Sequence, residues 1–351
     1  MKVFCYFVEP ASYTLDLANN IYDDLNIEYC FINSKTLALS SKKPKKKSLD
    51  KMSLFSRTAF ILSQYRKNDF IIVNGYNNYP FILTFLLNLF SFKKRFIATD
   101  SDTQFRIPTS FLKRFIKWIY LSIIFKNKYV LGFAGGSNSH KDLFRNYGMN
   151  EERIFLMPLM VNNMRFYKDF KQFPKIFTFL YVGRLVKHKN VESLIQQFNI
   201  NFIDKPAVLR IVGSGDRAEY LENKYASDKV IFTGKKFNID LEKEFKNASC
   251  FVCPSEFEPW GLVVNEALSS SLPVIATNEV GASFDLIKDK NTGFVVNNMN
   301  DFGNRMIELY NNSALLLEYS KNACELMKNH WNYNFYHKCL IAVIEKIKEC
   351  R

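Results

Sequence analysis

Two glutamates and a glycine stand close together in the segment PSEFEPWGLVVNEALSSSLPVIAT, which covers residues 254–277. Seven residues, among them Gly261, separate Glu258 from Glu266. The pattern predicts a strand before this segment and a helix from about Val263, so Glu258 is expected in a loop and Glu266 on the first turns of the helix. A carboxylate near a helix N-terminus is stabilised by the dipole and can accept two hydrogen bonds from a vicinal diol such as ribose. Gly261 would let the backbone approach a phosphate without a Cβ in the way. The alternative for Glu266 is a surface residue that only complements the dipole.

Two cations, Arg184 and Lys189, follow another predicted strand and precede a predicted helix. A diphosphate can bind at such a place, because backbone N–H groups of the helix lie nearby and the cations neutralise its charge. The alternative is a solvated basic turn, since Lys187 and His188 lie between the two.

Glycines lie at or near the ends of three predicted strands of the same half of the chain. Gly183 precedes Arg184, Gly213 and Gly215 lie in VGSGD, and Gly234 with Lys235 lies in FTGKK. Each allows close approach of the backbone to a ligand, although a single G-x-G is equally well a tight strand-to-helix turn.

The elements that would position these residues form two β/α successions. Strands are predicted at 2–8, 27–33, 70–76 and 95–102, and a strand, glycine turn and helix over 129–148. After these, strands are predicted at 177–185, 207–216 (with its turn), 230–234, 248–255, 273–277 and 292–296, with helices among them. At 351 residues the chain is long enough for two domains, and the polar stretch 162–175 separates the two halves. We therefore expect an α/β fold of two doubly wound, Rossmann-like domains facing a cleft, with domains at 1–168 and 175–330 and a C-terminal helix at 331–351.

Composition narrows the classes of protein that fit. No apolar run reaches the roughly 18 residues of a membrane span, and the first residues lack a signal-peptide pattern, so the protein is expected in the cytoplasm. The seven cysteines are odd in number and scattered, which favours reduced thiols. Cys250 and Cys253 form C-x-x-C without a second ligand pair, and we interpret them as core thiols and expect no metal.

The net charge of +14 is concentrated in the first half of the chain. Residues 1–170 carry 25 Lys and Arg against 13 Asp and Glu, and residues 35–128 alone carry 19 against 4. Within this part, the segments 81–95 and 108–128 interleave apolar and basic residues, with Trp118 in the second. Such helices can lie on an anionic membrane surface, or they can be ordinary core helices of the domain. A nucleic acid would also suit the charge, but no recognisable binding module accompanies it.

The C-terminal half resembles the family 4 retaining glycosyltransferases of GT-B fold. The resemblance rests on the E-x7-E segment, on YVGRLVKHKNVESLIQQF (181–198), and on LRIVGSGD and IFTGKK in the same order, and it covers roughly residues 177–296. It implies that Arg184 and Lys189 hold the donor diphosphate and that Glu258 contacts the donor sugar. It also implies that Gly261, Leu262 and Val263 offer backbone N–H groups to phosphate, that Glu266 binds the ribose, and that the C-terminal helix crosses back onto the N-terminal domain.

The sequence departs from this family at several positions. Ser271 stands where glycine is usual, and Asp285 where glutamate is usual. The first loop, VEPASY, lacks the usual glycine pair, and IATDSDTQFR lacks the usual histidine. Asp100 or Asp102 is therefore a candidate for the catalytic role there, and turn or cap roles are the alternative. Acceptor contacts are expected from Arg106, which could hold an acidic acceptor, and from Ser137 and Asn138.

The sequence thus predicts a retaining glycosyltransferase that moves a sugar from a nucleotide-sugar donor to a lipid-linked or cell-envelope glycan. It is expected to work at the inner face of the cell membrane without a metal or cofactor and without nucleic acid. The alternatives are a GT-B nucleotide-sugar epimerase, a soluble glycan synthase and, third, a nucleic-acid-binding protein.

Overall fold

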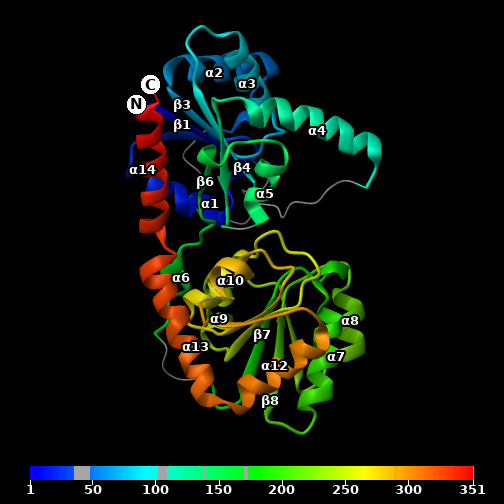
Figure 1. Ribbon diagram of the computed structural model, residues 1–351. Helices are drawn as coiled ribbons and strands as arrows, with labels where there is room; N and C mark the ends of the chain where they lie inside the picture. Colours follow the sequence, from blue (N-terminus) through cyan, green and yellow to red (C-terminus); the bar gives the residue numbers. More distant parts are fainter. Residues whose placement is uncertain (35–47, 102–108, 138, 170–172, 289, 351) are drawn as a thin grey trace. The chain divides into compact units, whose positions relative to one another are not determined.

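The computed structural model describes residues 1–34, 48–101, 109–137, 139–169, 173–288 and 290–350 (Figure 1). Contacts divide the chain into two compact units. Unit 1 comprises Met1–Met160 together with Tyr333–Arg351, and unit 2 comprises Val161–Asn332. The last helix thus belongs to unit 1, although the chain passes through unit 2 before reaching it.

Unit 1 is built on a parallel sheet of six strands in the order β2-β1-β3-β4-β5-β6. Its strands are short apolar runs that are buried along most of their length, as expected for a sheet with helices on both faces. The strands are β1 (Val3–Phe7), β2 (Glu28–Phe31), β3 (Phe70–Val73), β4 (Phe96–Ser101), β5 (Val130–Ala134) and β6 (Ile154–Leu156).

The helices of unit 1 begin where side chains can cap them. Ser53 accepts a hydrogen bond from the backbone of Ser56 at the start of α2, and Asn78 accepts one from Phe81 at the start of α3. The helical segments are α1 (Ser12–Leu17), η1 (Ala18–Tyr22), η3 (Leu49–Lys51), α2 (Leu54–Lys67), α3 (Tyr79–Phe90), α4 (Phe111–Lys126), α5 (Ser139–Asn146), η4 (Glu151–Arg153) and α14 (Tyr333–Glu349).

The C-terminal helix α14 packs against η1 and β6 of unit 1. The hydroxyls of Tyr22 and Tyr336 are hydrogen-bonded at 3.1 Å. Leu340, Val343 and Ile347 form a buried apolar stripe along the helix. The predicted return of this helix to the N-terminal fold is confirmed.

Unit 2 repeats the architecture with a second parallel sheet, in the order β12-β11-β10-β7-β8-β9. The strands are β7 (Phe177–Val182), β8 (Ala207–Val212), β9 (Val230–Gly234), β10 (Cys250–Cys253), β11 (Val274–Thr277) and β12 (Gly293–Val296). The helical segments are α6 (Asn163–Phe166), η5 (Lys187–Lys189), α7 (Val191–Phe202), α8 (Ala218–Tyr225), α9 (Asn238–Lys246), α10 (Leu262–Ser269), α11 (Ala282–Leu286), α12 (Met299–Asn311), α13 (Ser313–Glu325) and η6 (Leu326–His330).

Both sheets are doubly wound, with strand order reversing between β1 and β3 in unit 1 and between β7 and β10 in unit 2. In such sheets ligands bind beyond the carboxyl ends of the strands near the reversal. A ligand of either unit is therefore expected near the residues that follow β1, β3 and β4 in unit 1, and β7, β8 and β10 in unit 2.

Candidate functional site

The glycines after β7 and β8 let two strand ends approach each other closely. A Cβ on Gly213 would lie 1.8 Å from the carbonyl oxygen of Gly183, and one on Gly215 would lie 2.2 Å from that of Leu185. The amide of Gly213 in turn donates to the carbonyl of Gly234 at 3.0 Å, so Gly183, Gly213 and Gly234 follow neighbouring strands at one edge. Packing of backbone on backbone therefore already requires glycine at 213 and 215, before any ligand is considered.

The short turn η5 brings Lys189 inward and leaves Lys187 and Arg184 exposed. Lys189 is buried, with 8% of its surface accessible, and its ammonium group forms an ion pair with the carboxylate of Glu258. The alternative of a solvated basic turn is wrong for Lys189, because its side chain is buried and paired with a carboxylate. A lysine is rarely buried without such a partner. Two residues 69 positions apart, both predicted to contact the donor, are thus brought together.

The loop that carries Glu258 is held from the neighbouring segment 279–282. The amide of Glu258 donates to Glu279, and its carbonyl accepts from Gly281, at 3.0 Å each. Gly261 ends the loop with φ of +91°, in the left-handed region, and a Cβ there would lie 3.0 Å from Cγ of Glu258. Glycine at 261 therefore fits both the backbone conformation and the space beside the carboxylate.

Helix α10 starts directly after Gly261, so Leu262 and Val263 occupy its first turn. Backbone N–H groups of a first helical turn have no partner within the helix and point toward an incoming anion. Their predicted contact with phosphate is compatible with this position, and it stays a prediction.

Glu266 lies in the second turn of α10, beyond the reach of the dipole that we expected to stabilise its charge. Burial instead raises the pKa of Glu266 to about 8, and the positive charge of Arg165 only partly opposes this. The expected electrostatic setting was therefore wrong: in the absence of a ligand the carboxyl group is largely protonated at neutral pH.

Trp260, between Glu258 and α10, is anchored inside unit 2. Its indole N–H donates to Asn265 at 2.8 Å, and its ring stacks on Trp331 with centroids 5.6 Å apart. The side chain of Asn163 donates to the carbonyls of Met327 and Trp331 at 2.8 Å each. The loop is thus tied to the last residues of unit 2, a packing role that the sequence pattern did not indicate.

The remaining predicted donor residues lie nearer the solvent. Gly234 is exposed with φ of +68°, and nothing would lie within 4 Å of a Cβ there, so its conformation alone favours glycine. Lys235 is exposed, with its ammonium 4.7 Å from the centroid of the Phe237 ring. Their contacts with a donor stay predictions.

In unit 1, Asp100 lies near the carboxyl end of β4 and is held by the segment that follows β3. Its carboxylate accepts hydrogen bonds from the side-chain amide of Asn74 and from the backbone of Gly75. Ser137 is exposed after β5. Asp102, Arg106 and Asn138 lie outside the described residues.

A cavity of about 110 Å³ opens beside Asp100. It lies wholly in unit 1, and its polar wall includes Asn74, Ser101, Tyr22 and Tyr336. Sequence reasoning missed these four residues. Asn74 and Ser101 carried a usable signal, since each is a polar residue at the end of an apolar strand, whereas the two tyrosines come from distant helical segments.

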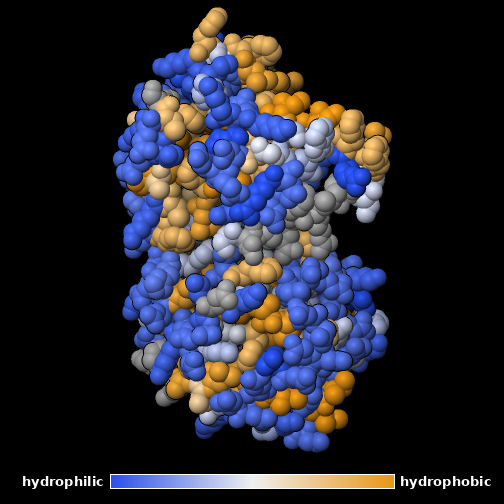
Figure 2. All heavy atoms as spheres, in the orientation of Figure 1, coloured by the Kyte–Doolittle hydropathy of each residue, from blue (hydrophilic) through white to orange (hydrophobic). Residues whose placement is uncertain are grey.

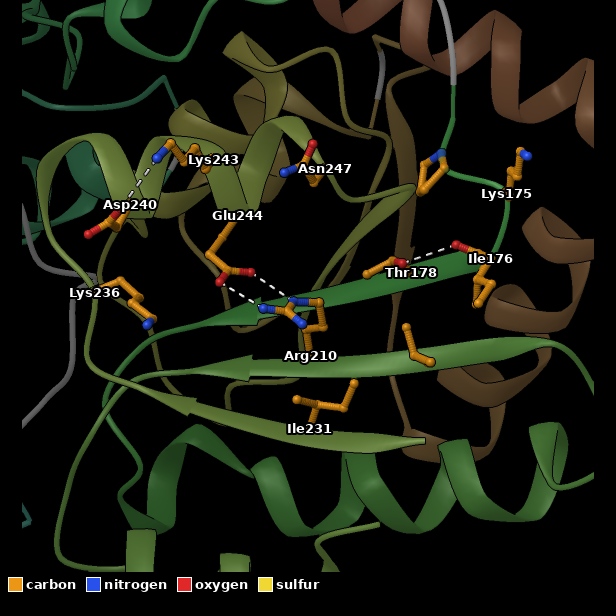
Figure 3. A pocket seen from close by; sticks show the side chains of 12 residues that line it. Lys175, Ile176, Thr178, Arg210, Ile231, Lys236, Asp240, Lys243, Glu244 and Asn247 are labelled. Carbon is orange, nitrogen blue, oxygen red and sulfur yellow. Dashed lines mark hydrogen bonds and ion pairs between the residues drawn. The ribbon is translucent and has the colours of Figure 1, made fainter. Parts of the chain in front are cut away.

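A second, more open groove of about 710 Å³ lies in unit 2 over β7, β8, β9 and α9 (Figure 3). Arg210 in its floor forms a two-pronged ion pair with Glu244 of α9, both contacts being 2.8 Å. Asp240 lies 3.7 Å from Lys243, and Thr178 donates to the carbonyl of Ile176. Arg210 and Glu244 thus satisfy each other in the floor of this groove, and neither was among the residues predicted to contact the donor.

Cys250 and Cys253 are buried in β10, which confirms their interpretation as core thiols. Burial raises the pKa of Cys253 to about 11, so this thiol stays protonated at neutral pH. Within the described ranges, no cluster of three or more His, Cys, Asp or Glu is arranged to hold a metal ion. The expectation of a metal-free reaction stays a prediction.

The two doubly wound parallel sheets and the returning C-terminal helix define the GT-B class of fold. A crystal structure of Anabaena Alr3699/HepE in complex with UDP superimposes with a TM-score of 0.77 at 13% sequence identity, covering 99% of this chain and 100% of that one. At this identity the likeness shows the fold alone, and it confirms the predicted fold class.

Residues 163–326 match the family model of glycosyl transferases group 1. The matched residues lie within unit 2.

Two curated relatives align with part of the chain. An uncharacterised glycosyltransferase of Methanocaldococcus jannaschii is 36% identical over 33% of this chain, and the capsular polysaccharide biosynthesis glycosyltransferase CapM of Staphylococcus aureus is 33% identical over 33%. The aligned part spans 31% of the length of each relative.

Proposed function

We propose that this protein is a retaining glycosyltransferase that transfers a sugar from a nucleotide-sugar donor, bound in unit 2, to a hydroxyl of a lipid-linked or cell-envelope glycan. In this reaction the bond from the anomeric carbon to the diphosphate breaks, a bond to the acceptor oxygen forms, and the acceptor proton is released. The observation that carries the proposal is the ion pair between the buried Lys189 and the partly exposed Glu258, beside the N-terminus of α10 and within the residues that match the glycosyltransferase group 1 model.

The chemistry of these groups suits a departing nucleoside diphosphate. The ammonium group of Lys189 and the first-turn N–H groups of Leu262 and Val263 can stabilise the negative charge that develops on the diphosphate. Once a donor diphosphate shares the lysine, the carboxylate of Glu258 becomes available to the hydroxyls of the sugar. The relative CapM, named for capsular polysaccharide biosynthesis, supports a cell-envelope glycan as acceptor.

Lysine substitutions in η5 test the donor site. Lys189→Ala is expected to abolish the thermal stabilisation that UDP-glucose, GDP-mannose or another member of a nucleotide-sugar panel gives to the wild type, which is about 2.7 kcal/mol at 100 times the dissociation constant. Lys187→Ala, an exposed cation two residues away, is the matched control and should keep it. Equal stabilisation of both variants by the same donor would place the donor elsewhere. Glu258→Ala should retain nucleotide binding but lose transfer.

We further propose that unit 1 binds an anionic membrane surface through the N-terminal half of α4. The alternative, that this helix is an ordinary core helix, fits only its C-terminal half, where Leu121, Ile124 and Phe125 are buried. The apolar residues before them are exposed, from 39% for Ile119 to 73% for Phe111. They include Leu112, Phe115, Ile116 and Trp118, and Lys113 and Arg114 are exposed among them.

Orange spheres gather along α4 and near the tops of α2 and α3 in the space-filling view (Figure 2). Exposed Phe90 and Phe92 at the end of α3 and Leu54 and Phe55 at the start of α2 contribute to the apolar surface of unit 1. Large exposed apolar patches mark interaction sites, and a mixture with cations suits the head-group region of an anionic bilayer. Among the described helices, none is long and apolar enough to span a membrane.

Vesicle flotation tests the membrane proposal with matched apolar substitutions. On vesicles of equal parts phosphatidylcholine and phosphatidylglycerol at low salt, wild type should float, and Phe111→Ser/Phe115→Ser should lose most of this binding. Ile200→Ser/Ile203→Ser, which alters comparably exposed residues of unit 2, should not. If wild type fails to float at low salt, or both double variants float alike, the assignment of α4 is wrong.

A further inference from the structure

We propose that Trp331 is a positioning residue for the donor: by stacking on Trp260 it holds the donor loop, residues 256–261, in the conformation that binds the nucleotide sugar. This inference rests on the proposed donor site in unit 2. It means that donor affinity depends on the segment by which the chain leaves unit 2, although no residue of that segment needs to contact the donor.

Backbone hydrogen bonds fix the donor loop on two sides. The amide of Glu256 donates to the carbonyl of His188 in η5 at 2.9 Å. On the other side the loop pairs with residues 279–282, where the amide of Ala282 donates to the carbonyl of Trp260 at 2.9 Å. Among the side chains of the donor loop, that of Trp260 alone is buried, with 3% of its surface exposed. Trp260 is therefore the side chain that ties the loop to the interior of unit 2.

Trp331 supplies the surface on which Trp260 packs. The two indole rings are nearly parallel, with centroids 5.6 Å apart and planes at 16°, and Trp331 is itself buried. Such aromatic pairs attract each other beyond the area that they bury. The indole N–H of Trp260 donates to Asn265 in α10 at 2.8 Å, which fixes the direction of the ring. One side chain of the donor loop thus contacts both α10 and Trp331.

The chain presents Trp331 through a π-helical turn. This turn, η6, follows α13 directly, and in it the amide of Trp331 donates to the carbonyl of Leu326 at 2.8 Å. Turns of this kind are rare and frequently occur at functional sites. The side chain of Asn163 donates to the carbonyls of Met327 and Trp331 and so holds the turn in place. The segment by which the chain enters unit 2 therefore supports the segment by which it leaves.

Donor affinity should fall when this support is removed, because the groups proposed to bind the donor lie in the loop or directly after it. Glu258 lies in the loop, and the N–H groups of Leu262 and Val263 follow at the start of α10. A misplacement of about 1 Å in a preorganised site can cost about 100-fold in activity, and a loose supporting residue is enough to cause it. We expect a loss of about tenfold in affinity, since the backbone hydrogen bonds of the loop remain.

Isothermal titration of the full chain tests the effect on the donor. The probe is UDP-glucose, GDP-mannose or another member of the nucleotide-sugar panel that binds wild type, at a temperature where every variant is folded. Trp331→Ala should weaken binding by about tenfold, whereas Trp331→Phe keeps a flat ring and should stay within about threefold of wild type. Rescue by phenylalanine would show that the stacked ring is what matters.

Phe202→Ala is the matched control for loss of a buried ring. Phe202 is fully buried at the end of α7 and stacks on Phe198 with centroids 5.3 Å apart. Its other ring contacts are with Phe179 and Tyr310, which lie outside the donor loop. The variant should lower the stability of unit 2 and keep the affinity of wild type for the donor, because a purely structural loss does not move the loop.

Hydrogen exchange without any nucleotide tests the positioning itself. Peptides that cover residues 255–263 and 279–284 contain the amides that hold the donor loop. Trp331→Ala should raise exchange in these peptides by about tenfold relative to wild type, because the loop opens locally more often. Phe202→Ala should raise it no more there than in the rest of unit 2.

A pair of asparagine variants tests the support of the turn. Asn163→Ala removes the two hydrogen bonds to the carbonyls of η6 and its end, and it should raise exchange in the donor loop and weaken donor binding as Trp331→Ala does. Asn322→Ala removes a hydrogen bond of the same kind, to the carbonyl of Asn291 at 2.8 Å, and should leave both quantities unchanged. This pair gives the same judgement if Trp331→Ala does not fold.

The outcomes separate this inference from the proposed function. If wild type binds no member of the panel, the proposed donor site is wrong and the role of Trp331 in donor binding is wrong with it. If wild type binds a donor, equal affinity of Trp331→Ala and wild type would overturn this inference alone. Equal losses of affinity in Trp331→Ala and Phe202→Ala, or unchanged exchange in the donor loop of Trp331→Ala, would overturn it as well and leave the proposed function standing.

Discussion

Replacing Glu266 by glutamine is expected to stabilise unit 2 at high pH and to leave its stability almost unchanged at low pH. Burial raises the pKa of Glu266 from 4.5 to about 8 in the folded state. Between these values the folded state keeps a proton that the unfolded chain releases. The free energy of unfolding therefore falls as pH rises through this window, and the loss is complete above the folded-state pKa.

The size of the effect follows from the shift. Each pKa unit corresponds to about 1.4 kcal/mol, so the full shift sets an upper bound of about 5 kcal/mol between pH 4 and pH 9. Because the side chain is partly accessible to solvent, which weakens the cost of burying its charge, we expect about 2–4 kcal/mol. Glutamine is nearly isosteric with the protonated acid and does not titrate.

Tryptophan fluorescence can follow unit 2 selectively. Trp260 and Trp331 are buried and stacked in unit 2, whereas Trp118 is half exposed in unit 1 and can be replaced by phenylalanine in every variant. Urea unfolding should give nearly equal free energies for the parent chain and the Glu266→Gln variant at pH 5, and a clear advantage for the variant at pH 9. Glu222→Gln, on the exposed face of α8, is the control and should show no such divergence. A glutamine advantage that is the same at both pH values would refute the reasoning.

Three further predictions concern backbone and ion-pair energetics, each measured by urea unfolding. Gly213→Ala should lower the free energy of unfolding by more than about 3 kcal/mol, because its Cβ would lie 1.8 Å from a carbonyl oxygen. Gly234→Ala has open space around it and should lower this free energy by only about 1 kcal/mol, because of its positive φ. Equal losses for the two variants would contradict the close approach of the strands. Ser271 has φ of +57°, so Ser271→Gly should be about 1 kcal/mol more stable than Ser271→Ala, both having lost the hydrogen bond to Lys168, and the reverse order would argue against the left-handed conformation. A double-mutant cycle on Arg210 and Glu244 should give a coupling of about 1 kcal/mol, and a value near zero would mean that solvent screens the pair.

The sequence alone predicted the positions of strands and helices well, but it did not predict how burial affects the charge of a side chain. Apolar runs such as FIIV at 70–73 predicted buried strands because a parallel sheet covered on both faces needs continuous hydrophobic residues. Gly261 before a helical pattern predicted the start of α10 to within a residue. The expected stabilisation of the Glu266 carboxylate by the helix dipole was wrong, because burial by residues far away in sequence is not visible in a local pattern.

The structure shows how serine is accommodated at position 271, where the resembling family usually has glycine. The sequence showed serine where the resembling family usually has glycine, and the structure places this residue in the left-handed region that glycine tolerates best. Its hydroxyl donates to the carbonyl of Lys168, about a hundred residues away in the chain, and this bond partly offsets the unfavourable conformation.

By itself, the sequence determined two β/α successions, the glycine turns at their strand ends and the segment that carries Glu258, because periodicity, turn residues and spacing are local properties of the chain. Only the tertiary structure decided that Lys189 is buried against Glu258, that the apolar half of α4 is left exposed, and that Asn74 and Ser101 share a cavity. These facts depend on which distant segments pack together, since burial and pairing are set by neighbours in space.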